Sequence, residues 1–255
     1  MGKPNKIKYQ NTCNILGVEV AVTDMEKTLR FLCDNLQDLR GKYICVSNVH
    51  TVVTAYEDER YKEIQNASAM ILPDGKPLSL VQKRRGFSEA QKVSGPDLMP
   101  EIFRISEEKG YTHFFYGSTD ETLKKLVVNL KNQFPGLKIA GVYSPPFRAL
   151  SEKEDIEITE MLNKADADFL WVGLGAPKQE IWMAEHEDRV RALMIGVGAG
   201  FDFHAGTVKR APKWMQSCCL EWLYRLFQDP KRLFKRYAVT NVKFLLYLYK
   251  ICNAK

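Results

Sequence analysis

Short apolar runs alternate along the chain with longer segments in which apolar residues recur every three or four positions. The apolar runs, rich in β-branched and aromatic residues, are KYICVS, SAMIL, THFFYG, LKIAGVY, DFLWVGLG and RALMIGVG. The segments of helical period between them are Thr51–Ala67, Asp97–Lys109, Thr119–Phe134, Glu152–Lys164 and Lys178–Asp188. This alternation predicts an α/β fold with a mainly parallel, Rossmann-like sheet and helices on both of its faces.

The two ends of the chain depart from this alternation. Near the start, NILGVEVAVTD predicts a β-hairpin, or a strand leading into a helix that Thr23 or Asp24 caps. After Ala211 the pattern predicts helices only: Pro212–Phe227, Pro230–Tyr237 and Ala238–Ile251. We therefore expect an α/β body over residues 1–208 and a C-terminal helical appendage over 209–255.

Charge separates the same two parts of the chain. The net charge is +6, but from Lys209 onward eleven Lys and Arg face two acids, which gives +9 there and −3 for residues 1–208. With 45% hydrophobic and 11% aromatic residues the chain can bury a sizeable core. A basic tail on a globular body favours an anionic partner, either a nucleic acid or the negative inner face of a bilayer.

Targeting and metal-binding patterns are not found in the sequence. The six cysteines form no CxxC pair and the four histidines have no zinc spacing, so we expect a reduced interior without metal. Residues 1–10 are polar, and the apolar run FLLYLY is far shorter than the ~20 residues of a membrane span. These features predict a cytoplasmic protein that associates peripherally, at most, with the inner face of the membrane.

Asp74 is the candidate for acid–base chemistry. It lies in ILPDGKP, directly after an apolar strand, and open α/β sheets bind ligands at the carboxyl ends of their strands. An Asp-Gly pair in this place is also typical of an ordinary turn, and the pattern alone leaves both readings open.

Two glycine-containing turns are candidates for binding phosphate. In FFYGSTDETLKKL, Gly117 and Ser118 join a strand to a helix, so free N–H groups could face a diphosphate. In VGLGAPKQE, Gly175 permits close backbone approach, and Lys178 and Gln179 fall in the first turn of a helix. A cation there opposes the helix dipole, which favours a role toward a ligand over that of an ordinary surface lysine.

The basic tail interleaves cations with aromatic side chains. The stretch GVGAGFDFHAGTVKRAPKWMQ leads into it, and Trp and Tyr beside Lys and Arg are typical of a bilayer interface. A structural alternative packs the aromatics on the body and leaves the cations solvated, and some arginines could also close over the active site. The cations concerned are Arg210, Lys213, Arg225, Lys231, Arg232, Lys235 and Arg236.

The chain resembles the WecG/TagA/CpsF family of bacterial glycosyltransferases from about Leu16 to Tyr237. Three motifs carry this resemblance and follow one another in the family's order: LPDGKPLSL, VGLGAPKQE and GVGAGFDFHAGTVKRAPKWMQ. The resemblance implies that Asp74 is the catalytic base, that Asn48 lines the same pocket and that Gln179 lies near a nucleotide-sugar. It also implies a UDP-sugar donor, a polyprenyl-diphosphate-linked sugar acceptor and a place in teichoic-acid, capsule, exopolysaccharide or other cell-surface polysaccharide synthesis.

One carboxylate suffices for such a transfer, because a nucleoside diphosphate leaves without needing a proton. We expect direct displacement with inversion at the anomeric carbon and no cofactor. No D-x-D motif follows a strand, and Asp166 and Asp168 precede one and should form a solvated turn. The sequence therefore predicts a metal-independent enzyme in which cations balance the diphosphate: Lys92, Lys178, Lys209 and Arg210.

Two departures from the family pattern leave the donor sugar open. Lys92 stands where the family usually has arginine, and Val46 where it has threonine. N-acetylmannosamine or a related hexosamine or uronic acid is the expected sugar, with a UDP-glucose-type hexosyltransferase or a non-catalytic nucleotide-sugar-binding regulator as alternatives. A nucleic-acid-binding module would leave Asp74 and the glycine turns without a role, so we expect no nucleic acid partner. The sequence leaves open whether the chain forms a homo-oligomer.

Overall fold

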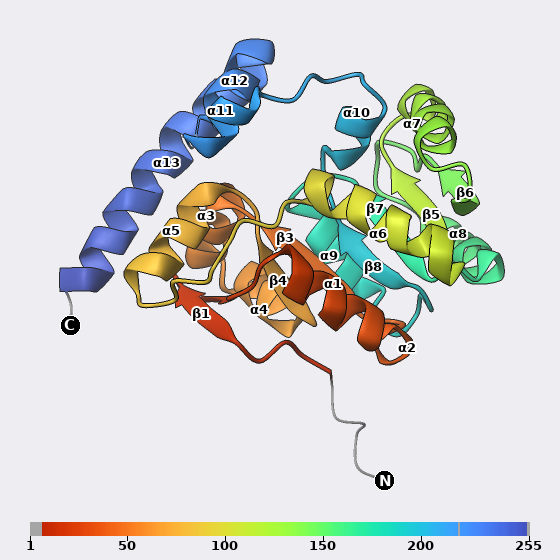
Figure 1. Cartoon of the computed structure of the whole chain (residues 1–255), viewed down its shortest axis with the longest axis horizontal. Coiled ribbons are helices and arrows are strands. Elements are labelled where there is room, and N and C mark those ends of the chain that lie inside the picture. Colours follow the sequence, from red (N-terminus) through yellow and green to blue (C-terminus); the bar gives the residue numbers. More distant parts are fainter. Residues whose placement is uncertain (1–6, 219, 254–255) are drawn as a thin grey trace, which may run out of the picture.

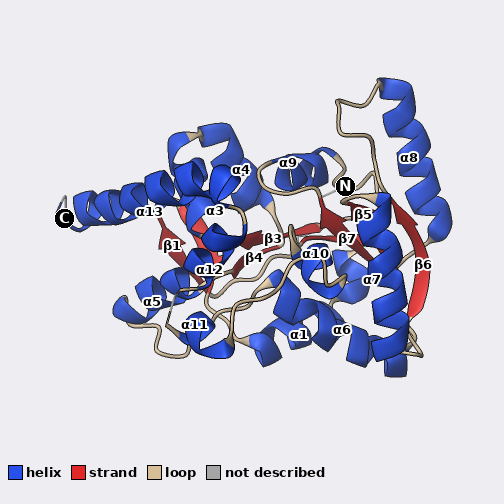
Figure 2. Ribbon diagram, turned by 90° about the horizontal axis from the view of Figure 1, so that it is seen from above, coloured by secondary structure: helices blue, strands red, loops and turns tan. Residues whose placement is uncertain are grey.

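The structure, a computed structural model, describes residues 7–218 and 220–253. At its centre is a six-stranded sheet in the order β4-β3-β8-β7-β5-β6, with every neighbouring pair parallel (Figure 2). The strands are β3 (Tyr43–Ser47), β4 (Met70–Pro73), β5 (Thr112–Gly117), β6 (Lys138–Tyr143), β7 (Phe169–Gly173) and β8 (Leu193–Gly196). The predicted fold class is confirmed, and each predicted apolar run contains one of these strands except SAMIL, beyond which β4 extends by one residue, Pro73.

Helices cover both faces of the sheet, which explains why its central strands are apolar throughout. In β3, Tyr43 and Cys45 face one core, and Ile44 and Val46 face the other. The first face carries α3 (Val49–Glu57), α4 (Glu59–Ala67), α8 (Glu152–Ala165) and α9 (Lys178–Glu185). The second carries α1 (Met25–Asp34), α2 (Leu36–Leu39), α6 (Gly95–Lys109), α7 (Asp120–Gln133) and α10 (Gly200–His204).

The N-terminal hairpin is confirmed and adds a second, two-stranded sheet. Strands β1 (Thr12–Ile15) and β2 (Val18–Ala21) pair antiparallel across a turn in which Leu16 and Gly17 have φ of 53° and 87°. Asp24, not Thr23, caps the following helix, because its carboxylate accepts from the Lys27 N–H at 2.8 Å.

The helices directly before and after β4 differ from the sequence prediction. The segment Thr51–Ala67 is not one helix: it breaks at Asp58, whose extended backbone and side chain cap a new helix, α4. Helix α5 (Lys76–Arg84) was not predicted, because the Asp74-Gly75 pair is also typical of an ordinary turn. Instead, Gly75 has a φ of 91° and turns the chain from β4 directly into a helix with proline in its first turn.

The C-terminal segment is helical, as predicted, but it is divided differently. The predicted helix Pro212–Phe227 is two helices, and the two predicted helices after Pro230 are one. The three observed helices are α11 (Lys213–Ser217), α12 (Glu221–Gln228) and α13 (Pro230–Asn253). Within the described ranges, no helix combines the length and the apolar character that crossing a bilayer requires.

Helix α13 lies along α3 of the body (Figure 1). Phe244 is buried in the core on that side. Glu57 of α3 accepts hydrogen bonds from Lys243 Nζ at 2.7 Å and from the Tyr247 hydroxyl at 2.5 Å. Helix α13 is therefore packed against the body.

Candidate active site

Asp74 and Asn48 follow the neighbouring strands β4 and β3 at the carboxyl edge of the sheet. The strand register pairs Ser47 with Pro73, so the residues that come next lie side by side. The Asp74 N–H donates to the Ser47 carbonyl at 2.7 Å. The Asn48 side chain hydrogen-bonds to the Asp74 carboxyl group, and its oxygen caps the first turn of α3. The structure thus brings together the two residues that the resemblance assigned to one pocket.

The surroundings of Asp74 raise the pKa of its carboxyl group above that of an ordinary aspartate. Burial raises the pKa of its carboxyl group to about 6, and the negative charge of Glu221 adds to the rise. The charges of Lys92 and Arg225 and the hydrogen bond from Asn48 oppose it. A general base works best when its pKa lies near the working pH, so this environment suits the predicted role of Asp74. That role stays a prediction.

Lys92 and Arg210, two of the predicted diphosphate-binding cations, lie together against Asp97 at the start of α6. Lys92 Nζ is 3.2 Å from one carboxylate oxygen, and Arg210 Nη1 donates to the other at 2.7 Å. Burial alone would raise the pKa of Asp97, but hydrogen bonds from Arg210 and Ser94 and the charge of Lys92 hold it well below its usual range. Asp97 therefore stays ionised and fixes both cations in place.

Arg225 brings the C-terminal helices to the same group. Its guanidinium carbon is 5.4 Å from the centre of the Phe203 ring, and that of Arg210 is 5.8 Å from the same ring. Arg225 is thus a predicted tail cation that the structure places at the site. Four others have side chains outside what the structure describes, so their predicted contacts with a membrane or an acceptor diphosphate stay predictions: Lys213, Arg232, Lys235 and Arg236.

Gln179 has a structural position that sequence reasoning did not foresee. The residue is 3% exposed, and its side-chain oxygen accepts from the N–H groups of Gly175 at 3.2 Å and Gly198 at 3.0 Å. Its nitrogen donates to buried Glu180 at 2.8 Å, which also accepts from the Tyr61 hydroxyl at 3.0 Å. Gln179 therefore ties the turn after β7 to the loop after β8. Its contact with a nucleotide-sugar stays a prediction.

Close strand packing accounts for the glycine of the other predicted turn. Gly117 has a φ of 123°, and a Cβ atom there would come within 2.6 Å of the Gly173 backbone. The Ser118 N–H donates to the Gly173 carbonyl at 3.1 Å. Ligand contacts of Gly117 and Ser118 stay predictions, as do those of Lys178 and Lys209, which are both exposed.

Three acidic residues of this region were missed, and the sequence held a signal for two of them. Asp97 follows Ser94 by three residues at a helix start, a spacing typical of capping, and here the Ser94 hydroxyl donates to Asp97 at 2.5 Å. Glu221 is one of only two acids in the strongly basic tail that begins at Lys209. Nothing in the sequence distinguishes Glu180 from a surface acid.

Asp166 and Asp168 lie at the opposite, amino edge of the sheet, as expected. They do more than form a solvated turn, because both carboxylates pair with Arg40. Asp168 also accepts from the Thr112 N–H at 2.9 Å, which fixes the start of β5. The expectation of a purely solvated turn is therefore wrong for Asp168, whose side chain is only 18% exposed.

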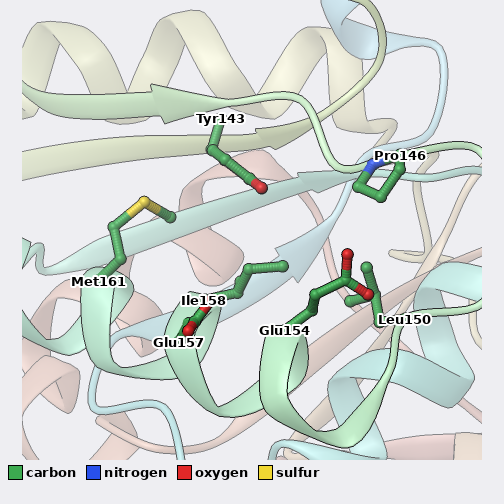
Figure 3. Close-up of a pocket in the computed structure, with 7 residues that line it drawn as sticks. All are labelled: Tyr143, Pro146, Leu150, Glu154, Glu157, Ile158 and Met161. Carbon is green, nitrogen blue, oxygen red and sulfur yellow. The ribbon is translucent and has the colours of Figure 1, made fainter.

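A pocket of about 160 Å³ lies between the end of β6 and helix α8, away from Asp74 (Figure 3). Tyr143 of β6 forms one side of it, and Glu154, Glu157 and Met161 of α8 lie across from that tyrosine. Acidic walls do not suit a diphosphate, so we do not assign the predicted site to this pocket. Among the residues that the structure describes, no group of three or more His, Cys, Asp or Glu is placed to hold a metal ion.

Together these features define a class of protein: an α/β enzyme with a carboxylate of raised pKa beside clustered cations at the carboxyl edge of its sheet. A model of the glycosyl transferase WecG/TagA/CpsF family matches residues 13–254. The chain belongs to this family and is a glycosyltransferase.

Two relatives illustrate the similarity. Both are named N-acetylglucosaminyldiphosphoundecaprenol N-acetyl-beta-D-mannosaminyltransferase. The protein of Bacillus spizizenii is 30% identical over 198 residues, which cover 77% of this chain and 75% of the relative. The protein of Staphylococcus aureus strain MW2 is 28% identical over 247 residues, which cover 95% of this chain and 92% of the relative.

Proposed function

We propose that this glycosyltransferase moves N-acetylmannosamine, or a related hexosamine or uronic acid, from a UDP-sugar to a polyprenyl-diphosphate-linked sugar. The names of the relatives support the acceptor and the sugar. The observation that carries the proposal is the Asp74 carboxyl group, with a pKa of about 6, among the charges of Lys92 and Arg225. The reaction would serve cell-surface polysaccharide synthesis.

The transfer needs one base and a stabilised leaving group. The acceptor hydroxyl oxygen attacks the anomeric carbon while its proton passes to Asp74. The bond from that carbon to the diphosphate oxygen breaks, and its electron pair leaves with UDP. Direct displacement inverts the anomeric centre. Lys92, Arg210 and Arg225 stabilise the charge that develops on the diphosphate, as preorganised cations do in group transfer.

The C-terminal helices suit an acceptor that is held in a membrane. Besides the residues packed on α3, helix α13 carries apolar side chains that are exposed, among them Leu245 at 67% and Tyr249 at 69%. The surrounding tail carries the excess positive charge of the chain. Apolar contact and attraction to anionic lipids together support reversible, peripheral binding to the inner face of the membrane.

A UDP-release assay tests the proposal. Purified protein is given a panel of UDP-sugars with a short-chain prenyl-diphosphate GlcNAc acceptor, and the Asp74→Asn variant serves as the inactive control. We expect acceptor-dependent UDP release from UDP-N-acetylmannosamine or a close relative. Release from UDP-glucose alone would favour the exopolysaccharide hexosyltransferase, and no release with any sugar would favour a non-catalytic regulator.

A further inference from the structure

Glu221 is an acid of the C-terminal helices that lies on the cations of the site. Its carboxylate is 3.7 Å from Lys92 Nζ and 4.0 Å from Arg210 Nε. It also contributes to the raised pKa of Asp74. Glu221 is the first residue of α12, so these contacts join the tail to the body at the active site.

The two carboxylates on these cations are held very differently. Asp97 accepts hydrogen bonds at 2.7 Å from Arg210 and 2.5 Å from Ser94, and both partners fix its orientation. The contacts of Glu221 with the same cations are too long for hydrogen bonds. Of the two acids, Glu221 is therefore the one that another anion can replace.

Arg210 has a donor that is available to such an anion. Among the described residues its buried Nε has no hydrogen-bond partner, although the Glu221 carboxylate lies on that side. A buried N–H group that stays unpaired costs free energy, so an oxygen that approached closer than Glu221 would be favoured. A diphosphate oxygen has the charge and the acceptor capacity for this position.

Charge balance leads to the same conclusion. Within the described part of the chain, three acids face three cations at this site: Asp74, Asp97 and Glu221 face Lys92, Arg210 and Arg225. A diphosphate added to this balanced group would leave it strongly negative unless one carboxylate withdrew. Asp97 is fixed and Asp74 follows a strand, whereas Glu221 lies on a helix outside the sheet.

We propose, on the basis of the proposed function, that Glu221 occupies the diphosphate position while the donor is absent and withdraws when the donor binds. Glu221 is thus a competing anion that sets donor affinity. Because it lies on α12, its withdrawal also loosens one contact between the C-terminal helices and the body. Donor binding is thereby linked to the arrangement of the segment that we propose to contact the membrane.

Binding of UDP and of inorganic pyrophosphate to the full-length protein tests the inference. The variant Glu221→Gln keeps the shape of the side chain and removes its charge, so we expect both ligands to bind about fivefold to tenfold more tightly. The gain should shrink as salt is raised, because screening weakens the competition. Thermal unfolding of each variant checks that it is folded.

Glu57→Gln is the matched control, because Glu57 also joins the tail to the body but pairs with Lys243 and Tyr247 away from the site. We expect its ligand affinities to match those of the wild type. Unchanged or weaker binding in Glu221→Gln, or an equal gain in both variants, overturns the inference.

The pyrophosphate arm separates this inference from the proposed function. If the wild type binds pyrophosphate but not UDP, and Glu221→Gln still binds pyrophosphate more tightly, the UDP donor is contradicted while the role of Glu221 stands. If the wild type binds neither ligand, both are overturned.

Discussion

The strand ends that carry Asp74 and the C-terminal helices that lie beside it are held in place in different ways. Main-chain register and a backbone hydrogen bond of 2.7 Å fix Asp74 against β3. Helix α12 reaches the site through charged side chains, including the 3.7 Å contact of Glu221 with Lys92. The proposed reacting group is therefore held by the main chain, whereas the contact between α12 and the site is made by side chains.

We expect the largest effect from a change of Asp74, the residue that the main chain holds in place. Replacing Asp74 by Asn removes the base, and we expect turnover to fall by about 10²–10⁴-fold while UDP still binds. Asp166→Asn, at the opposite edge of the sheet, is the control and should keep near-normal turnover. Wild-type turnover in Asp74→Asn would remove this residue from the mechanism.

A smaller effect should come from the exposed face of α13. Leu245 and Leu246 are 67% and 53% exposed, so replacing both by Asp should spare the fold. Because the variant loses apolar contact and gains negative charge, we expect binding to anionic liposomes to weaken by about tenfold or more. Turnover of a soluble short-chain acceptor should be unchanged. Unaltered liposome binding would leave α13 with a structural role only.

The buried position of Asp74 should also lower the stability of the folded protein at neutral pH. Its pKa is raised to about 6 in the folded state, so its favourable contribution is present below the unfolded pKa and is lost as pH rises through 6. Asp74→Asn should therefore be more stable than the wild type at neutral pH, by on the order of 3 kcal/mol, with the difference vanishing near about pH 4. Urea unfolding at several pH values measures this. A variant less stable at neutral pH contradicts the raised pKa.

The smallest expected effect is that of chelation. If Lys92, Arg210 and Arg225 carry the charge of the diphosphate, EDTA should leave turnover unchanged in the UDP-release assay. Loss of activity in EDTA that Mg²⁺ or Mn²⁺ restores would contradict this account of the leaving group, since a metal would then supply the stabilisation.

The sheet could be predicted because its central strands are buried on both faces and are therefore continuous apolar runs, such as Tyr43–Ser47. The family resemblance implied the proximity of Asn48 and Asp74, and the register of the parallel strands that precede them explains it. Helix α5 was missed because the Asp74-Gly75 pair before it also fits an ordinary turn. The tail helices were divided wrongly because helical periodicity alone does not mark where one helix ends.

The charged contacts of the site could not be predicted, because they join residues far apart in the chain. Arg210 and Asp97 are 113 positions apart in the sequence, so no local pattern predicts the hydrogen bond between them. The burial of Gln179 depends likewise on two loops that tertiary packing brings together. The sequence shows which residue types follow the strands, whereas the residues that they contact are known only from the folded structure.

The pH dependence of kcat/KM tests the central claim, that Asp74 is a base of raised pKa, most directly. This quantity reports the ionisation of groups in the free enzyme. We predict that kcat/KM with the preferred UDP-sugar falls about tenfold per pH unit below an apparent pKa of about 6. A profile that stays level down to about pH 4.5 would contradict the claim, because an ordinary carboxylate titrates below that value.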